Sequence, residues 1–404
     1  MKRVLTFILF VNFISVLNSQ WTSQSSGTSV ALNGVSFTNA NLGTVVGENG
    51  TILRTTNGGT TWTVQSSGSI IDLYSVSFID TFGTAVGDVS TILRTTNGGT
   101  NWVEQSSNTT NDLRGVSFTD TSNGTAVGSQ GQILRTTDGG STWSEQSSGT
   151  TNILRGVSFT DINNGTAVSQ NGKILRTTDG GINWDEQPSG TLNDLYGVSF
   201  TDSNFGTVVG QNGKILRTTN GGTDWSSQAS GTTNDLFAVS FTDSINGTTV
   251  GESGKILRTT NGGTNWSSQS SGTFNDLYGI SFTDANYGTI VGEGGLILRT
   301  TNGGVTFTED ENDLTTPKIF RLSQNYPNPF NPITKINFSV PKQSTVTLII
   351  YDALGKEVTT LINEEVSIGN YSIEFSGSNL SSGIYFYEMK ADEFIQTSKM
   401  ILLK

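Results

Sequence analysis

The sequence contains neither cysteine nor histidine, and these two absences remove several classes of chemistry. Without cysteine the chain has no disulfide and no thiolate nucleophile. Without histidine it has no Ser-His-Asp or Cys-His catalytic group and no ordinary zinc site. Charged residues are few, at 14%, and the acidic ones stand singly rather than in the dense clusters that calcium favours. We therefore expect no metal and no cofactor.

Long hydrophobic runs are also scarce, and the one apolar stretch of note lies at the N-terminus. Lys2 and Arg3 precede a mostly apolar segment at residues 4–17, and Ser19 offers a small residue for cleavage. This segment is too short to span a membrane but is typical of a secretory signal. We predict that residues 1–19 are a signal peptide and that the mature protein is secreted or held at the cell surface, with no transmembrane span.

Basic residues are outnumbered, and the net charge is −12. Residues 317–404 carry eight basic and eight acidic side chains, so the acidic excess lies in the preceding region. A surface of this sign repels nucleic acid and anionic lipid at long range. We therefore expect neither as a partner.

What the sequence has in abundance is glycine and an internal repeat. The triplet Ile-Leu-Arg begins at Ile52 and recurs after 40 residues and then at intervals of 41. Each unit holds four short apolar runs separated by turn-forming residues, which predicts four strands and no helix. Seven such units predict an all-β, seven-bladed β-propeller over residues 20–310, with a β-solenoid as the alternative. Either the Trp21 segment or the Phe307 segment can supply the strand that completes the last blade, and we favour Trp21.

Within each unit, Thr55-x-Asn57-x-Gly59-x-Thr61-Trp62 and its copies resemble the Asp-box, or bacterial neuraminidase repeat. The resemblance implies a structural hairpin between the third and fourth strands. Its Asp or Asn caps turn amides, its glycines take positive φ and its Trp packs between sheets. The implied structural positions are Asn57, Asn97, Asp138, Asp179, Asn220, Asn261 and Asn302, with Trp62, Trp102, Trp143, Trp184, Trp225 and Trp266.

The whole-repeat pattern G-x-x-G-x-I-L-x-T-x-(Asp/Asn)-G-G-x-x-W resembles the photosystem II stability and assembly factor propellers. The resemblance covers residues 21–310. It implies a seven-bladed scaffold that binds a protein partner and performs no chemistry.

The C-terminal region differs in composition, since five of the six prolines lie at or beyond Pro317. The blocks FRLSQNYPNPFNPITKINFSVP, VTLIIYDALGKEV and SGIYFYEMKADEFIQTSKMILLK resemble the type A C-terminal sorting domain of the type IX secretion system. The resemblance covers residues 318–404 and implies a small immunoglobulin-like β-sandwich that the outer-membrane translocon recognises as a sorting signal. Residues 311–317 are the predicted linker. Alternation in residues 335–340 and 346–351 predicts strands independently.

Two repeated sets of charged residues are weak candidates for catalysis. The seven arginines of the Ile-Leu-Arg triplets occupy one position in every blade, whereas a sialidase site needs three arginines from unlike positions. We predict that each arginine pairs with an acid or carbonyl of its own repeat, with the aspartates of the Phe-Thr-Asp segments as candidate partners. The repeated glutamates also lack a pair unique to one blade.

The position just before the Gly-Val-Ser-Phe segment varies between blades, and function in a propeller usually lies where the repeats differ. The seven residues at this position, which we call the rim, are Asn33, Tyr74, Arg114, Arg155, Tyr196, Phe237 and Tyr278. The last six could hold a peptide or stack sugar rings. Alternatively, they only pack the entrance of the central channel. We predict an exported, non-catalytic binding or scaffolding module for a protein or glycan. A glycan-active enzyme and a surface adhesin remain alternatives.

Overall fold

The computed structural model describes residues 20–305, 317 and 319–403, and these residues form two units that we treat separately. The predicted signal peptide, most of the predicted linker and Phe307 lie outside the described residues. Within the described part, no helix has the length and hydrophobicity that a membrane crossing requires. Strands and turns make up both units, as the sequence predicted.

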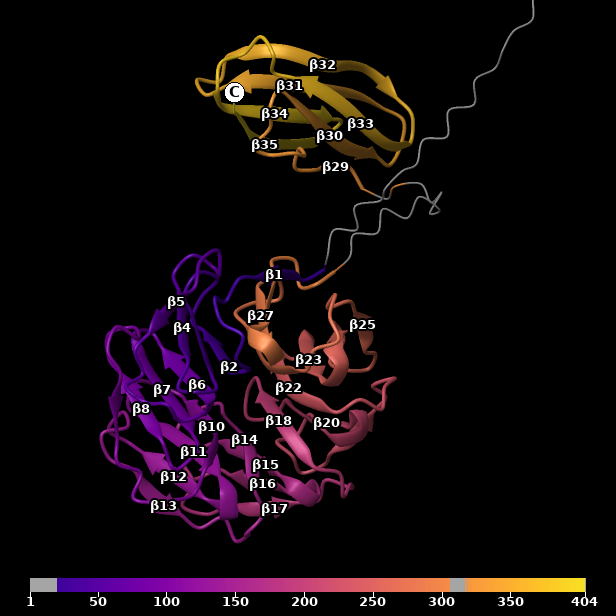
Figure 1. The fold of residues 1–404 in the computed structure, drawn as a ribbon. Helices are drawn as coiled ribbons and strands as arrows, with labels where there is room; N and C mark the ends of the chain where they lie inside the picture. The colour runs from indigo at the N-terminus through magenta and orange to yellow at the C-terminus, as the bar shows by residue number, and fades with distance from the viewer. Residues whose placement is uncertain (1–19, 306–316, 318, 404) are drawn as a thin grey trace, which may run out of the picture. The chain divides into compact units, whose positions relative to one another are not determined.

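The first unit is a ring of seven antiparallel sheets of four strands each, the blades of a propeller (Figure 1). The first, innermost strands are β2 (Leu32–Phe37), β6 (Leu73–Ile79), β10 (Leu113–Phe118), β14 (Leu154–Phe159), β18 (Leu195–Phe200), β22 (Leu236–Phe241) and β26 (Leu277–Phe282). The second strands are β3 (Gly43–Gly47), β7 (Phe82–Gly87), β11 (Gly124–Gly128), β15 (Gly165–Ser169), β19 (Gly206–Gly210), β23 (Gly247–Gly251) and β27 (Gly288–Gly292).

The outer half of each blade holds the two shorter strands. The third strands are β4 (Ile52–Thr55), β8 (Ile92–Thr95), β12 (Ile133–Thr136), β16 (Ile174–Thr177), β20 (Ile215–Thr218), β24 (Ile256–Thr259) and β28 (Ile297–Thr300). The fourth strands are β5 (Thr63–Gln65), β9 (Val103–Glu104), β13 (Ser144–Gln146), β17 (Asp185–Gln187), β21 (Ser226–Gln228), β25 (Ser267–Gln269) and β1 (Thr22–Gln24). Blade one is β2 to β5, and blade seven is β26 to β28 with β1.

The ring is closed by the N-terminal strand, as we predicted. Strand β1 pairs antiparallel with β28, with Thr22 opposite Arg299 and Gln24 opposite Ile297. Trp21 is 1% exposed and meets the ring of Phe282 edge-on at 5.9 Å between centroids. Blade seven is therefore assembled from both ends of the repeat region.

The hydrophobic core of the propeller lies between blades. Val209 and Ile215 of blade five pack with Leu236, Val239 and Leu257 of blade six, and similar clusters fill the other junctions. The second strands are buried along their length, apart from Phe82 at the start of β7, because neighbouring blades cover both of their faces. This explains why the Gly-Thr-Val-Val-Gly runs are apolar without alternation.

A continuous ring of hydrogen bonds joins the innermost strands. The Ser36 Oγ accepts the amide of Phe78 in the next blade at 3.2 Å, and the Ser281 Oγ of blade seven accepts the amide of Phe37 at 3.1 Å. The same bond recurs at all five junctions between them. A Cβ on Gly34 would lie 2.8 Å from the carbonyl oxygen of Tyr74, so glycine permits this close approach.

The loops between the second and third strands turn sharply on one face of the ring. In blades three to seven they contain single-turn 3-10 segments: η1 (Ser129–Gly131), η2 (Gln170–Gly172), η3 (Gln211–Gly213), η4 (Glu252–Gly254) and η5 (Glu293–Gly295). These loops and those between blades form the face on which the innermost strands begin.

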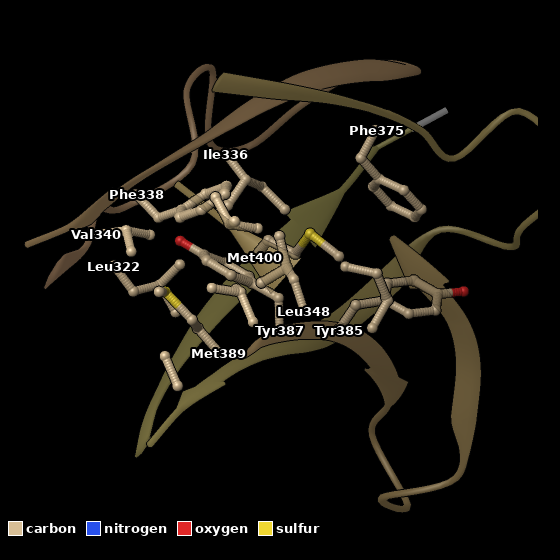
Figure 2. Close-up of a cluster of buried hydrophobic side chains, with 14 of the residues drawn as sticks. Leu322, Ile336, Phe338, Val340, Leu348, Phe375, Tyr385, Tyr387, Met389 and Met400 are labelled. Atoms are coloured by element: carbon tan, nitrogen blue, oxygen red, sulfur yellow. The ribbon is translucent and has the colours of Figure 1, made fainter. Parts of the chain in front are cut away.

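The second unit is the small β-sandwich that the sequence predicted. One sheet holds β29 (Arg321–Leu322), β30 (Ile333–Val340) and β33 (Gly369–Ser376). The other holds β32 (Glu357–Val366), β31 (Ser344–Asp352), β34 (Gly383–Ala391) and β35 (Phe394–Leu402). Figure 2 shows the core between them, where Ile336 and Phe338 of one sheet meet Leu348, Tyr387 and Met389 of the other. The Tyr387 hydroxyl is satisfied by donating to the Ser323 carbonyl at 2.8 Å.

Candidate functional site

The Asp-box hairpin between the third and fourth strands is a structural turn. The Asn57 Oδ1 accepts the amide of Thr61 at 3.0 Å, and the Thr55 Oγ1 accepts the amide of Gly59 at 2.8 Å. Gly58 and Gly59 take φ values of 67° and 86°, which favour glycine. Trp62 meets Phe37 edge-on at 6.0 Å. The turn is therefore held by its own side chains and backbone, and Trp62 packs beside it.

A glutamine whose role the sequence did not reveal joins five of these seven hairpins to the preceding blade. The Gln187 side chain of blade four donates to the Gly221 carbonyl at 3.2 Å and accepts the indole N–H of Trp225 at 3.3 Å, both in blade five. The same pair of bonds is made by Gln24, Gln146, Gln228 and Gln269. The repeated Trp-x-x-Gln spacing was the available signal, because an amide can satisfy both groups at once.

Blade two interrupts this pattern at both of its junctions. Gln65 donates to the Thr63 hydroxyl of its own strand instead, and Gln105 donates to the Val103 carbonyl two residues before it. The Nε1 atoms of Trp102 and Trp143 are consequently buried with no hydrogen-bond partner in the described structure. Blade two is also the unit that is one residue shorter. It is therefore the least regular member of the ring.

The carboxylate of Asp138 gives a testable pH dependence for the Asp-box. Hydrogen bonds from the Thr142 hydroxyl and amide and from Thr136 lower its pKa from the usual value to about 2. Because the folded pKa is depressed, the stabilisation is present above the unfolded pKa of about 3.9 and is lost as pH falls through about 2. We expect a carbon-detected NMR titration of Asp138 to show a midpoint near pH 2. Asp138→Asn should remove this acid-linked loss while leaving stability at neutral pH nearly unchanged, because five repeats carry Asn. A midpoint near 3.9 would contradict this account.

The repeated arginines do not pair as we predicted. The Arg217 Nη1 donates to the Thr207 Oγ1 of its own blade at 2.8 Å, but its Nη2 donates to the Ser244 carbonyl of the next blade at 2.7 Å. Its guanidinium also lies 4.8 Å from the ring centre of Phe241 in that blade. Arg135, Arg176, Arg258 and Arg299 repeat this arrangement.

The aspartates that we predicted to pair with these arginines instead accept hydrogen bonds within their own loops. The Asp120 Oδ1 accepts the amides of Ser122 and Asn123 in its own loop, at 2.7 and 2.8 Å. No ion pair joins such an aspartate to a repeated arginine among the described residues. The prediction was wrong because the aspartate stabilises its own turn, leaving the arginine to bridge blades.

Arg94 of blade two is the member of this set that points elsewhere. Its Nη1 donates to the Ser141 Oγ at 3.2 Å at the exposed outer edge. Phe82, Phe118 and Thr84 border the small space near its side chain. This departure coincides with the shortened loop of blade two.

The rim lies where the innermost strands begin, at a β-bulge in each blade. The pairing register shifts between Leu113 and Gly115, for example, which leaves Arg114 as the extra residue. The six predicted binding residues are all half-buried. Asn33 donates to the Leu73 carbonyl at 2.9 Å.

Contacts divide the six residues into two groups. The Arg114 guanidinium lies 4.0 Å from the ring centre of Tyr74. In the second group, Arg155 lies 5.2 Å from the ring centre of Tyr196. From Tyr196 the rings continue through Phe237 at 5.7 Å to Tyr278 at a further 5.8 Å, each pair tilted by nearly 50°. We call Tyr196, Phe237 and Tyr278 the aromatic arc.

Carboxylates are held beside the rim by backbone amides of neighbouring blades. The Asp235 Oδ1 accepts the amide of Asn212 at 2.8 Å, which leaves its Oδ2 to accept the Tyr196 hydroxyl at 3.3 Å. Asp72, Asp112, Asp194 and Asp276 are fixed by the same kind of bond. Each aspartate comes two residues before a rim residue, so the loop geometry brings negative charge to this face.

This environment raises the pKa values of two tyrosines of the rim. Burial first, and then the hydrogen bond to Asp88, raise the pKa of Tyr74 to about 12. Burial and the nearby charges of Asp235 and Asp194 raise the pKa of Tyr196 to about 12. These hydroxyls therefore stay protonated at neutral pH and act as hydrogen-bond donors.

Comparison with protein families identifies both units. The model described as photosynthesis system II assembly factor YCF48 matches residues 14–110, 146–227 and 190–270, which together span more than half of the chain. The chain belongs to this family. The model described as secretion system C-terminal sorting domain matches residues 324–403. The chain combines YCF48-like repeats with a sorting domain. It is therefore an exported propeller that is delivered to the cell surface or beyond. No match was found among the curated proteins.

Solved structures share the fold of the first unit. A structure titled YCF48 bound to D1 peptide is 22% identical, with a TM-score of 0.61, and covers 70% of this chain and 97% of its own. YCF48 from Cyanidioschyzon merolae is 22% identical with a TM-score of 0.60, covering 69% of this chain and 98% of its own. A computationally designed protein, Ika8, is 12% identical with a TM-score of 0.53, covering 69% and 98%. At these identities the likeness shows the propeller fold alone.

Proposed function

We propose that the propeller is a non-catalytic binding module that works at the cell surface or outside the cell, with its ligand site at the rim. The observation that carries this proposal is the combination of variation and contact at one ring position. Unlike side chains there form the aromatic arc and the two arginine–tyrosine stacks. Half-buried aromatic rings with polar tips are well suited to molecular recognition.

The absence of catalysis is proposed from how the repeated groups are used. A sialidase-like site needs three arginines that converge on a substrate carboxylate. Six of the seven repeated arginines in the described propeller instead donate to threonine hydroxyls of their own blades. Five of these also donate to a carbonyl of the next blade. Groups committed to blade packing are poor candidates for substrate binding.

A peptide is the ligand class that we favour. The structure titled YCF48 bound to D1 peptide has the same fold and therefore gives a precedent for a peptide on such a scaffold. We further propose that residues 318–404 address the chain to the outer-membrane translocon and are then dispensable for binding. A glycan ligand is the alternative outcome of the experiment below.

The test is an array of peptides and surface polysaccharides probed with residues 20–404. A variant with Tyr74, Tyr196, Phe237 and Tyr278 replaced by alanine should lose at least about tenfold in affinity, since each ring contributes on the order of 0.5–1 kcal/mol. Phe274→Ala is the matched control, because Phe274 is a 92% exposed aromatic in the loop between blades six and seven. Equal binding by the wild type and the rim variant would refute the rim as the site.

A further inference from the structure

We infer that the aromatic arc binds a cationic side chain, lysine or arginine, of the ligand peptide. This inference rests on the proposed binding function and names the chemistry of the ligand. Its basis is the presence of three adjoining aromatic rings and several carboxylates on one part of the rim. An aromatic face attracts a cation through the negative charge above the ring plane, and neighbouring carboxylates reinforce that attraction.

The carboxylates near the arc come from four adjoining blades, five to seven and blade one. Burial and then the charges of Asp235 and Asp194 raise the pKa of Tyr196. Burial and then the charges of Asp276, Glu293 and Glu48 raise the pKa of Tyr278. The last of these belongs to blade one, so the negative region continues across the closing junction. Glu252 adds a further carboxylate in blade six, where its Oε2 accepts the amide of Asp235, two residues before Phe237, at 3.3 Å.

The same contact between a cation and an aromatic ring occurs within the chain at two neighbouring positions of the rim. Arg114 stacks on Tyr74 and also approaches the Asp112 carboxylate at 3.0 Å. Arg155 stacks on Tyr196 at one end of the arc. Among the described residues, no cation lies over Phe237 or Tyr278. These two rings and their carboxylates thus match the arginine sites but lack an internal cation.

Other cations of this face do not neutralise the arc. Lys173, Lys214 and Lys255 precede the third strands, in the outer half of their blades. Lys173 is paired with Glu186, and the Lys214 Nζ donates to the Ser227 Oγ of the fourth strand at 3.5 Å. The positive charges of the rim itself, Arg114 and Arg155, belong to blades three and four. The arc in blades five to seven is therefore the negative part of an asymmetric rim.

The aspartates beside the arc keep their negative charge when they accept hydrogen bonds from backbone amides. Each uses one oxygen to cap a turn, as Asp276 does for the Ser253 amide at 2.9 Å. A carboxylate keeps further lone pairs free to accept hydrogen bonds from an ammonium or guanidinium group. The same bonds hold the carboxylates in place before a ligand arrives, which lowers the entropic cost of binding.

The experiment uses residues 20–404 and three fluorescein-labelled peptides in which glycine alternates with lysine, glutamate or serine. Fluorescence anisotropy at physiological ionic strength measures their affinities. We expect the lysine peptide to bind more tightly than the other two. The double variant Phe237→Leu/Tyr278→Leu removes two rings but keeps apolar bulk, and it should weaken lysine-peptide binding about tenfold. Phe274→Leu should change it little.

A second pair of variants distinguishes the effect of a carboxylate beside the arc from the effect of the overall negative charge of the propeller. Asp276→Asn keeps the oxygen that caps the turn and removes the charge beside Tyr278, so it should weaken the lysine peptide about threefold. Asp224→Asn removes one charge at the exposed Asp-box edge and should have a smaller effect. Unchanged tryptophan fluorescence and urea midpoints would confirm that all variants are folded.

The outcomes distinguish this inference from the proposed function. Tighter binding of the serine or glutamate peptide, lost in the double variant, would overturn the cationic ligand but keep the rim as the site. Equal lysine-peptide affinity in the double variant and in Phe274→Leu would show diffuse charge attraction and overturn the inference. No binding of the lysine peptide would overturn it too, and silence of the whole array would then refute the proposed function.

Discussion

Replacing Trp21 by alanine is expected to lower the free energy of unfolding of the propeller by about 3–5 kcal/mol. The indole is 1% exposed and packs against Phe282, and its Nε1 donates to the Gln269 Oε1 at 2.9 Å. Its loss also weakens the strand β1 that holds blade seven closed, which exposes the edge of β28. Urea unfolding followed by tryptophan fluorescence is the measurement. All seven tryptophans lie in the repeat region, so the signal reports on the propeller alone.

The matched control is Trp62→Ala, at the same repeat position in blade one. Trp62 is only half-buried, and its blade is formed by one continuous stretch of chain. We expect a smaller loss of stability there. An unfolding midpoint of Trp21→Ala equal to that of the wild type would contradict closure of the ring by the N-terminal strand.

Arg217→Met is expected to cost about 2–3 kcal/mol of stability. Arg217 is 5% exposed, and its guanidinium satisfies the Thr207 hydroxyl and the Ser244 carbonyl while stacking on Phe241. A buried hydrogen bond to a charged group contributes about 1.5–3 kcal/mol, and methionine leaves both oxygens without this donor. The cost of burying the charge is relieved in the variant, which keeps the net loss below the sum of the contacts.

Arg94→Met provides the internal comparison for this prediction. Arg94 occupies the same repeat position, but its Nη1 donates to the exposed Ser141 hydroxyl. We expect a loss of no more than about 0.5 kcal/mol, typical of a surface substitution. Equal losses for the two variants in the same urea experiment would mean that the bridging contacts of Arg217 contribute nothing to stability.

The fold could be predicted from the sequence because its signals repeat. Seven copies of the same four apolar runs gave the strands and their number, and the surplus tryptophan at Trp21 gave the closing strand. Alternation in the tail predicted β30 and β31 of the sandwich. The boundaries of the linker and the signal peptide remain predictions, since most of those residues lie outside the described structure.

The contacts between blades could not be predicted in the same way. Periodicity identifies which residues share a strand, but it does not say which blade supplies the partner of a side chain. The arginines were therefore assigned to acids of their own repeat, whereas the carbonyl that accepts from Arg217 belongs to the next blade. The bridging role of Gln187 and the serine ring around the innermost strands were missed for the same reason.

The rim was found in the sequence as a variable position in a constant repeat. The sequence placed its members on one ring but did not show that they form two contact groups. Their separation arises because Arg114 and Arg155 turn toward Tyr74 and Tyr196 on opposite sides. The aspartates that flank the rim were not singled out either, since each fills a repeated position. Their effect depends on the fold bringing them to the channel mouth.

The central claim is that near-identical blades build a scaffold and that binding occurs once, where the blades differ. The stoichiometry of binding tests this claim most directly. Isothermal titration calorimetry of residues 20–404 with the ligand recovered from the array should give one ligand per chain. A value near seven would mean that each blade carries its own site, as an adhesin with many weak sites would, and would contradict the claim.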